Sequence, residues 1–403
     1  MVTLEDVQAA LPRIRDRIYY SPCARSETLS RLTGTQAWLK LENLQMTGAY
    51  KERGALNKLL TMSPEERSRG LIAASAGNHA QAVAYHGGRL GVRTTIVMPE
   101  TTSIMKVANT RAHGARIVLA GSSYDEAYAE ARRLEREEGL AFIHPFDDPE
   151  VIAGQGTIGL ELLEQAPDLD AVVVPIGGGG LASGVAVAVK SLKPSVRVIG
   201  VEAEVLACMR GALDAGKPVS LEPASTLADG IAVKRAGDLT FAHVQRYVDE
   251  LVTVSEEEIA SAILYLLERE KTVAEGAGAV SVAALMHRKA AGLAGKRVVA
   301  LVSGGNIDVN LVARIIERGL VKDGRLVRVR VALQDKPGQL AKVSAIIAGA
   351  RANVIEVHHT RAFATRFGDT TLELTLETRG QEHVDEVLQA LRERGYQVER
   401  VGV

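Results

Sequence analysis

The sequence predicts an α/β protein built on parallel sheets, followed by a smaller α+β unit. Three observations carry this prediction. Strand-like and helix-like segments alternate from about residue 36. Residues 171–202 then contain a β-branched run, four consecutive glycines, a helical segment and a second apolar run. After about residue 320 the composition changes, and the remaining residues follow a different pattern.

The first alternating stretch follows a charged, helix-like N-terminal segment. Its expected strands are residues 37–41, 71–75, 94–98, 115–119 and 141–146, and its expected helices are residues 79–88, 106–112 and 122–138. Alternation of this kind implies a parallel sheet whose faces are covered by helices.

Residues 171–202 form the clearest strand–turn–helix–strand unit. The strand is predicted over residues 171–174, the glycine turn over 177–180, the helix over 181–192 and the next strand over 196–201. A later strand, residues 297–302, runs into Ser303-Gly304-Gly305-Asn306. Ligand sites in open α/β sheets lie beyond the carboxyl ends of strands, so the glycine turn is well placed to bind a ligand.

The end of the chain has a separate pattern. Residues 318–325 (RGLVKDGR) are charged and contain glycine, which favours a linker. Strands are predicted over residues 327–333, 354–359, 370–377 and 396–401, and helices over residues 339–350 and 382–394. A proline- and glycine-containing turn at residues 335–338 separates the first strand from the first helix. The order βαββαβ is that of a ferredoxin-like module.

Composition excludes several classes of protein. The chain has 403 residues, 46% of them hydrophobic, and a net charge of −1, which gives no sign of nucleic-acid or anionic-membrane binding. No signal-peptide core or uncharged apolar stretch of about 18 residues is present, so a membrane span is not expected. The two cysteines, Cys23 and Cys208, lack metal-ligand spacing, so no metal site is predicted and a cytoplasmic location is the default.

Lys51, in LENLQMTGAYKERGA, is the most informative single residue. A lysine alone is usually a solvated surface residue, but this chain also contains the contiguous turn Gly177, Gly178, Gly179 and Gly180. The N–H groups of such a turn and of the helix after it can hold a phosphate. A lysine together with a phosphate cradle indicates pyridoxal 5'-phosphate (PLP), because the lysine can form a Schiff base with the aldehyde. The alternative is a tight turn without a ligand. The contiguous glycines do not match the G-x-G-x-x-G dinucleotide pattern.

Two other turns are candidate parts of a site. Residues 75–79 (Ser75, Ala76, Gly77, Asn78 and His79) can offer N–H groups to a substrate carboxylate, or can be a plain helix start. Ser303 beside a pyridine nitrogen would leave that nitrogen unprotonated, which favours β-elimination; the alternative is a generic turn.

Three further residues carry weaker signals. His79, at a helix start, is more often structural than catalytic. Cys208 is expected to be a small buried hydrophobic residue. Glu275, in AEGAGA, is expected near the site, but its role is not readable from the sequence.

Five motifs together resemble a known family. They are TGAYKERGA around Lys51, SAGNHAQ at 75–81, GQGTIGLE at 154–161, PIGGGGLASG at 175–184 and VSGGN at 302–306. In this order they resemble fold type II PLP enzymes, which are tryptophan synthase β-like with two lobes of parallel sheet, and among them the threonine dehydratases (threonine ammonia-lyases). The tail, with DKPGQLAKV and NVIEVHHTR, resembles a single ACT domain. The resemblance implies a catalytic domain at 1–317 with a small lobe at about 50–150, a linker at 318–325 and a regulatory ACT domain at 326–403.

The resemblance also implies a role for each motif. Lys51 would be the Schiff-base lysine and the base that removes the α-proton, and Gly177, Gly178, Gly179 and Gly180 would hold the phosphate. Asn78 would bond the 3'-oxygen of the pyridine ring and Ser303 would face its nitrogen. Residues 75–79 would bind the substrate carboxylate.

Three positions depart from patterns in this family. Tyr50 replaces the usual phenylalanine before the lysine. Ala76 stands where serine racemases carry a second serine, so the proton donor for racemisation is missing. Glu202 matches one metal ligand of racemases, but Cys208 stands where an aspartate would be expected. The last two departures favour dehydration over racemisation.

The implied activity is the conversion of L-threonine, and of L-serine, to a 2-oxo acid and ammonia by a homo-oligomer, either a dimer or a tetramer. It would serve isoleucine biosynthesis or threonine catabolism. An amino-acid effector such as isoleucine or valine would bind the ACT domain near Asp335, Gly338 and Asn353. The alternatives are a serine dehydratase, a 3-hydroxyaspartate dehydratase or a serine racemase of the same fold, or an amino-acid sensor that has lost catalysis.

Overall fold

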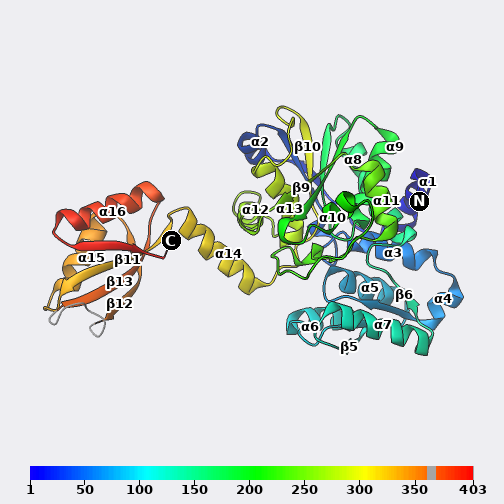
Figure 1. Ribbon diagram of the computed structural model, residues 1–403, viewed down its shortest axis with the longest axis horizontal. Helices are drawn as coiled ribbons and strands as arrows, with labels where there is room; N and C mark the ends of the chain where they lie inside the picture. Colours follow the sequence, from blue (N-terminus) through cyan, green and yellow to red (C-terminus); the bar gives the residue numbers. More distant parts are fainter. Residues whose placement is uncertain (361–368, 403) are drawn as a thin grey trace. The chain divides into compact units, whose positions relative to one another are not determined.

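A computed structural model describes residues 1–360 and 369–402 of the chain. The chain divides into two compact units, Met1–Ile307 and Asp308–Val403, which are coloured blue to yellow and yellow to red in Figure 1. Helix α14 (Val309–Lys322) belongs to the second unit, so the division falls before residue 317. Residues 318–322 of the predicted linker lie within this helix.

The first unit contains two sheets. The larger has the strand order β1-β2-β10-β7-β8-β9, and all its neighbouring strands are parallel except β1 and β2. Its strands are β1 (Cys23–Arg25), β2 (Gln36–Leu41), β7 (Ala171–Pro175), β8 (Arg197–Ala203), β9 (Glu250–Val254) and β10 (Arg297–Val302). The smaller sheet is parallel throughout, in the order β5-β4-β3-β6, with strands β3 (Leu71–Ala74), β4 (Thr94–Met98), β5 (Arg116–Leu119) and β6 (Ala141–Phe142). The prediction of two lobes with parallel sheets is confirmed.

Helices cover both sheets of the first unit (Figure 1). The α-helices are α1 (Leu4–Ile14), α2 (Glu27–Thr33), α3 (Lys51–Thr61), α4 (Pro64–Arg69), α5 (Asn78–Arg89), α6 (Ile104–Ala112), α7 (Tyr124–Glu138), α8 (Pro149–Gln165), α9 (Gly180–Leu192), α10 (Cys208–Ala215), α11 (Asp238–Tyr247), α12 (Glu256–Glu268) and α13 (Gly276–Met286). Short 3₁₀ helices are η1 (Arg15–Arg17), η2 (Glu42–Leu44), η3 (Glu204–Leu206) and η4 (Asp229–Ile231).

The core of the larger sheet explains its β-branched strands. All five residues of β7 are buried, as expected for a parallel strand covered on both faces. Apolar residues of β7, β8 and β10 pack with those of α8, α9 and α11 in one cluster. Cys208 lies fully buried in this cluster, which confirms its predicted role as a small core residue.

The smaller sheet has a different core on each face. Residues of α3 and α5 pack on one face, and Ala127, Ala131 and Leu134 of α7 pack on the other. The strand predicted over residues 141–146 is wrong beyond Phe142. Nδ1 of His144 accepts the N–H groups of Phe146 and Asp147, at 3.3 and 2.8 Å, and so stabilises a turn that leaves the sheet.

The second unit has the predicted βαββαβ order after helix α14. Its antiparallel sheet has the order β12-β13-β11-β14. The elements are β11 (Leu326–Gln334), α15 (Gln339–Gly349), β12 (Asn353–Thr360), β13 (Asp369–Glu377), α16 (Gln381–Glu393) and β14 (Gln397–Val401). Val327, Val329 and Val331 of β11 are buried while the residues between them are exposed, as the alternating sequence predicts.

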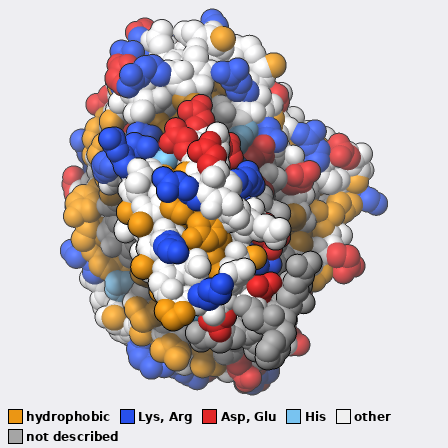
Figure 2. All heavy atoms as spheres, turned by 90° about the vertical axis from the view of Figure 1, so that its left-hand side faces the viewer, with side chains coloured by type: hydrophobic (Ala, Val, Ile, Leu, Met, Phe, Trp, Pro, Cys, Tyr) orange, Lys and Arg blue, Asp and Glu red, His pale blue; other side chains and the backbone are white. Residues whose placement is uncertain are grey.

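The surface agrees with the near-zero net charge. On the face drawn in Figure 2, the described Lys and Arg side chains are interspersed with Asp and Glu side chains. Across residues 1–360 and 369–402, no helix is both long enough and apolar enough to span a membrane.

Candidate active site

The carboxyl ends of three neighbouring parallel strands meet at one edge of the larger sheet. Strand β2 leads to the segment before Lys51, β10 ends next to Ser303, and β7 leads into the glycine turn. A pocket lies at this edge, as expected for an open α/β sheet. Its lining comprises Tyr50, Lys51, Asn78, Phe146, Pro175, Gly177, Gly178, Gly179, Gly180, Leu181, Gly230, Ile231, Val233, Glu275, Ala277 and Ser303.

Lys51 begins helix α3 and directs its amine into this pocket. Its Nζ donates to the carbonyl oxygen of Pro145 at 2.7 Å and lies 5.3 Å from the centre of the Tyr50 ring. Burial lowers the pKa of Lys51 to about 8, although the nearby Glu275 carboxyl opposes this shift. An amine with such a pKa is partly neutral near physiological pH and can act as a nucleophile or base.

The glycine turn packs too closely for side chains. A Cβ on Gly178 would lie 2.4 Å from the ring of Phe146, and one on Gly177 would lie 2.8 Å from Cα of Ile231. Gly179 has φ +96°, a backbone conformation that residues with side chains rarely adopt. The turn leads directly into α9, whose first N–H groups lack partners within the helix. This combination suits a phosphate.

Asn78 and Glu275 form a polar pair on the wall of the pocket. Nδ2 of Asn78, in the first turn of α5, donates to Oε1 of Glu275 at 2.6 Å. Burial, with a smaller contribution from the nearby Asp229 carboxyl, raises the pKa of Glu275 to about 7, although the hydrogen bond from Asn78 opposes the shift. Glu275, whose role the sequence leaves unread, is therefore a buried carboxyl that titrates near neutral pH.

Ser303 and the residues of the turn at 75–79 differ in their burial and in their contacts. Ser303 is buried, and its hydroxyl lies 3.3 Å from the carbonyl oxygen of Ala277. That distance is long for an O–H···O bond, so the hydroxyl can turn toward a ligand in the pocket. His79 is buried with Nε2 2.9 Å from the carbonyl oxygen of Ile143, and burial lowers its pKa to about 3, so its ring is neutral. Ser75, Ala76 and Gly77 are partly exposed beside Asn78.

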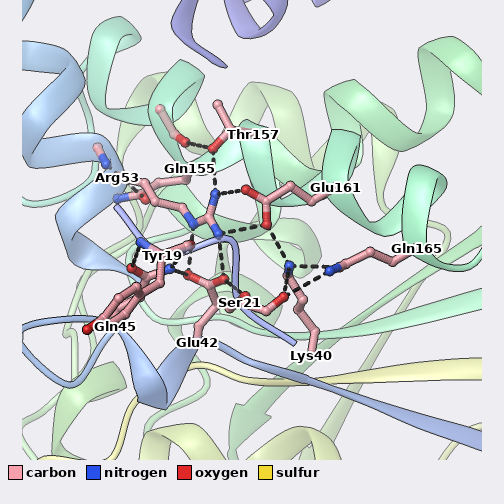
Figure 3. A network of polar contacts seen from close by, with 12 residues as sticks. Tyr19, Ser21, Lys40, Glu42, Gln45, Arg53, Gln155, Thr157, Glu161 and Gln165 are labelled. Atoms are coloured by element: carbon pink, nitrogen blue, oxygen red, sulfur yellow. Dashed lines mark hydrogen bonds and ion pairs between the residues drawn. The ribbon is translucent and has the colours of Figure 1, made fainter. Parts of the chain in front are cut away.

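A buried charge network fixes the helix that carries Lys51 (Figure 3). Arg53, with no exposed side-chain surface, donates Nε and Nη2 to Glu42 at 2.8 and 2.7 Å. Its Nη1 and Nη2 also donate to Glu161 of α8 at 2.6 and 2.9 Å. Lys40 of β2 donates to Glu161 at 2.6 Å. Two cations thus balance two carboxylates, which is the condition under which buried charges are tolerated.

Glu202 and Cys208, the two positions compared with the metal ligands of racemases, contact backbone groups of the chain. The two carboxylate oxygens of Glu202 accept the N–H groups of Met209 and Arg210, at 2.7 and 2.9 Å, at the start of α10. Sγ of Cys208 lies 3.5 Å from the carbonyl oxygen of Gly177. Within the described part of the chain, no group of three or more His, Cys, Asp or Glu side chains could hold a metal ion.

The second unit has a hollow of its own at the start of α15. It is lined by Gln334, Asp335, Lys336, Pro337, Gly338, Gln339, Leu340, His359 and Thr370. Asp335 and Gly338, two predicted effector residues, therefore lie together. Asn353 does not join them, because it begins β12 whereas His359 lies near the other end of that strand. Nδ2 of Asn353 donates to Glu377 at 3.2 Å.

Sequence reasoning misses several residues in and beside the pocket. The apolar pattern predicts a strand at Phe146, and Ile231 carries no recognisable signal. Asn306, which lies outside the pocket lining, is predicted only as the end of a turn, yet its side chain contacts Asn78. The VSGGN motif contained this signal, but the contact joins residues 228 positions apart in the sequence.

Comparison with known proteins agrees with this geometry. Residues 14–304 match the family described as "Pyridoxal-phosphate dependent enzyme", and residues 327–395 match the ACT domain. The chain is 50% identical over 403 residues to the L-threonine ammonia-lyase of Thermotoga maritima, with 100% of both chains covered.

Two solved structures are similar to the first unit. One is the processed form of threonine deaminase isoform 2 from Solanum lycopersicum, with a TM-score of 0.74 and 40% identity, covering 78% of this chain and 91% of that one. The other is maize serine racemase, with a TM-score of 0.75 and 32% identity, covering 80% of this chain and 98% of that one. The pocket's amine, glycine turn and helix start fit the aldehyde and phosphate of PLP, and the family match spans most of the chain. The chain therefore belongs to the pyridoxal-phosphate dependent enzymes and carries an ACT domain in its second unit.

Proposed function

We propose that this protein is a threonine ammonia-lyase that converts L-threonine to 2-oxobutanoate and ammonia and also acts on L-serine. The observation that carries the proposal is the position of Lys51, whose amine with a lowered pKa shares one pocket with the glycine turn and Ser303. The name of the Thermotoga maritima relative, which is similar over the full length, supports the choice of substrate. The reaction would serve isoleucine biosynthesis or threonine catabolism.

The proposed roles follow from the chemistry of each group. Lys51 would attach the cofactor covalently through Nζ, and the N–H groups of residues 177–180 and of the α9 start would hold its phosphate. Asn78 would donate to the 3'-oxygen of the ring. Ser303 would lie beside the ring nitrogen, which a hydroxyl would not protonate. Residues 75–79 offer N–H groups to the substrate carboxylate.

The residues of the pocket then act in sequence. When bound, the cofactor supplies an electron-withdrawing ring that makes the α-proton of the amino acid removable. With its amine free and neutral, Lys51 would take the α-proton at Nζ. That proton could return to the β-hydroxyl, which would leave as water, and a water molecule would then be consumed in the hydrolysis that yields the 2-oxo acid and ammonia. Binding energy contributes most by holding the substrate carboxylate in a fixed geometry relative to the lysine.

A serine racemase is the main alternative, since maize serine racemase has a similar structure. Ala76 argues against this reaction. Its methyl group cannot donate a proton, so position 76 lacks the hydroxyl acid that racemases resembling this family place opposite the lysine.

The second unit is the proposed site of regulation. An amino-acid effector such as isoleucine or valine binds the second unit at the hollow containing Asp335 and Gly338, where the start of α15 can receive a carboxylate.

Strand β12 is an edge strand with Ile355 and Val357 exposed, which supports side-by-side pairing of two copies in a dimer or tetramer. We also propose a cytoplasmic location, because both cysteines are free thiols.

A substrate panel tests the proposed function. Purified enzyme loaded with PLP is assayed with L-threonine, L-serine and 3-hydroxyaspartate, and the 2-oxo acid and D-amino acid products are measured. We expect the highest kcat/KM with L-threonine, and Lys51→Ala should lower turnover by several orders of magnitude because base and attachment point are lost together. Lys217→Ala, at an exposed lysine, is the control. D-serine as the main product, or normal turnover in Lys51→Ala, would contradict the proposal.

A further inference from the structure

Asn306 forms a polar contact between two segments of the site. Its Nδ2 donates to the carbonyl oxygen of Thr47 at 2.6 Å and to Oδ1 of Asn78 at 2.8 Å. Thr47 lies in the segment before Lys51, whereas Asn78 lies in the first turn of α5 beside the smaller sheet. A backbone carbonyl oxygen only accepts hydrogen bonds, so the contact with Thr47 identifies the nitrogen of the Asn306 amide. Both hydrogens of that nitrogen are then used.

The orientation of Asn78 follows from this contact. Its Oδ1 accepts from Asn306, so its Nδ2 must face the other way, toward Oε1 of Glu275 at 2.6 Å. An amide nitrogen carries two hydrogens, and Asn78 lines the pocket. One hydrogen serves Glu275, and the second can serve a ligand in the pocket. The opposite orientation would direct an acceptor at the carboxyl of Glu275.

The surrounding backbone keeps Asn306 in place. Gly305 N–H donates to the carbonyl oxygen of Gly48 at 2.9 Å, and Tyr50 N–H donates to that of Ser303 at 3.0 Å. Gly48 has φ +75°, and a Cβ there would lie 2.6 Å from Oδ1 of Asn306. The absence of a side chain at residue 48 therefore makes room for this amide.

We propose that Asn306 is a positioning residue, which orients the Asn78 amide so that its second N–H is available to the 3'-oxygen of the cofactor. The inference rests on the proposed role of Asn78 as donor to the 3'-oxygen. Asn306 itself is absent from the lining of the pocket and acts through Asn78. Asn306, Asn78 and Glu275 are thus three consecutive members of one hydrogen-bonded chain.

Cofactor affinity of the full-length chain tests the proposal. PLP is removed, and the apoenzyme is titrated with PLP while the absorption of the bound cofactor is recorded. Two variants are compared: Asn306→Asp accepts but cannot donate, and Asn306→Leu does neither and carries no charge. Both should bind PLP about fivefold to tenfold more weakly, the order expected for one lost buried hydrogen bond. The two replacement side chains differ in charge and in polarity. If one variant fails to fold, the PLP affinity of the other still tests the proposal.

The matched control is Asn310→Asp, which makes the same chemical change at an exposed residue of α14. It should bind PLP as the original chain does. A double-mutant cycle with Asn78→Ala separates positioning from general structural support. If Asn306 acts through Asn78, then Asn306→Leu should weaken binding much less in the Asn78→Ala background than in the original chain.

The possible outcomes distinguish this inference from the role of Asn78. Weak binding in both Asn306 variants, with non-additivity in the cycle, supports the inference. Normal binding in Asn306→Leu, or fully additive losses, overturns it while the role of Asn78 stands. Normal binding in Asn78→Ala would overturn the role of Asn78, and the inference would fail with it.

Discussion

At the scale of single residues, the first turn of α3 places three consecutive charged side chains in three different environments. Lys51 faces the pocket. Glu52 is fully buried; one of its oxygens accepts the N–H of Thr47, and the other lies 3.5 Å from Nε2 of His86. Arg53 faces the buried network. A helix turns by about 100° per residue, so neighbouring side chains necessarily point in different directions. The same turn therefore carries both the chemistry and its support.

The lowered pKa of Lys51 predicts how cofactor capture depends on pH. Only the neutral amine attacks the aldehyde, so the capture rate should rise with pH and level off above the pKa of about 8. A lysine with an ordinary pKa of about 10.4 would continue to gain reactivity up to that pH. The measurement is the rate at which apoenzyme takes up PLP between pH 6 and about 10.5, followed by absorbance. A rate that still rises steeply at the upper end would show that burial does not depress the pKa.

Glu275→Gln tests the sign of the electrostatic contribution. A nearby anion favours the charged ammonium, and Glu275 accordingly raises the pKa of Lys51 against the effect of burial. Its replacement by a neutral amide should shift the midpoint of the capture profile to lower pH. Glu382→Gln, at an exposed residue of α16, should leave the midpoint unchanged. A shift to higher pH in Glu275→Gln would contradict the electrostatic explanation.

Local pattern selects some residues of the pocket more readily than others. The glycine turn and Ser303 follow strands, and Lys51 lies between Gly48 and Gly54, so the sequence alone brings these residues forward. The contacts among Asn78, Glu275 and Asn306 depend on where distant segments meet. No local pattern contains that information, so the sequence gives no role for Glu275 and predicts Asn306 only as the end of a turn.

At the scale of elements, α3 is held by the charge network shown in Figure 3 rather than by its apolar residues alone. Burial alone would raise the pKa of Glu42, but Arg53, together with Lys40 and Ser21, leaves it lowered. Arg53→Met would leave Glu42 and Glu161 buried with one cation, Lys40, between them. We expect a loss of about 3–5 kcal/mol in the free energy of unfolding, the cost typical of breaking a buried ion pair. Denaturant unfolding of the first unit measures this loss.

Arg133→Met is the matched control for this element. Arg133 also pairs with two carboxylates, Glu130 and Glu137, but it lies on exposed α7 with 47% of its side chain accessible. Water and salt screen exposed pairs, which therefore contribute little to stability, so this variant should unfold almost as the original chain does. Equal losses in the free energy of unfolding of the two variants would mean that the buried network stabilises the protein no more than the exposed pairs do.

Most elements could be predicted because their patterns are local. The buried strands of both sheets read as apolar runs, and β11 reads as an alternating strand. Strand β6 shows the limit of this reasoning. Its apolar run continues past Phe142, yet Phe146 packs against Gly178 in the pocket instead of extending the sheet. An apolar residue that lines a site looks the same in sequence as one that belongs to a strand.

At the scale of the whole molecule, the chain combines a unit that matches the pyridoxal-phosphate dependent enzymes with a second unit that contains an ACT domain. The alignment with maize serine racemase covers 98% of that chain but only 80% of this one. A solved chain of this fold therefore has about the length of the first unit. Asn306 is the penultimate residue of that unit, and its side chain contacts Asn78.

Truncation of the chain tests whether the second unit controls the first. Isoleucine or valine should change the L-threonine saturation curve of the full-length enzyme, since an effector that prefers one state contributes about 1–3 kcal/mol of coupling, or about 5–150-fold in affinity. A chain ending at Lys322 lacks the hollow around Asp335 and Gly338, and it should remain active but ignore both amino acids. Asp335→Ala in the full chain is the matched point variant, and it should weaken the response while leaving the activity without effector unchanged. If the truncated chain kept the full response, the effector would have to bind within residues 1–322, and the ACT domain would serve assembly rather than sensing.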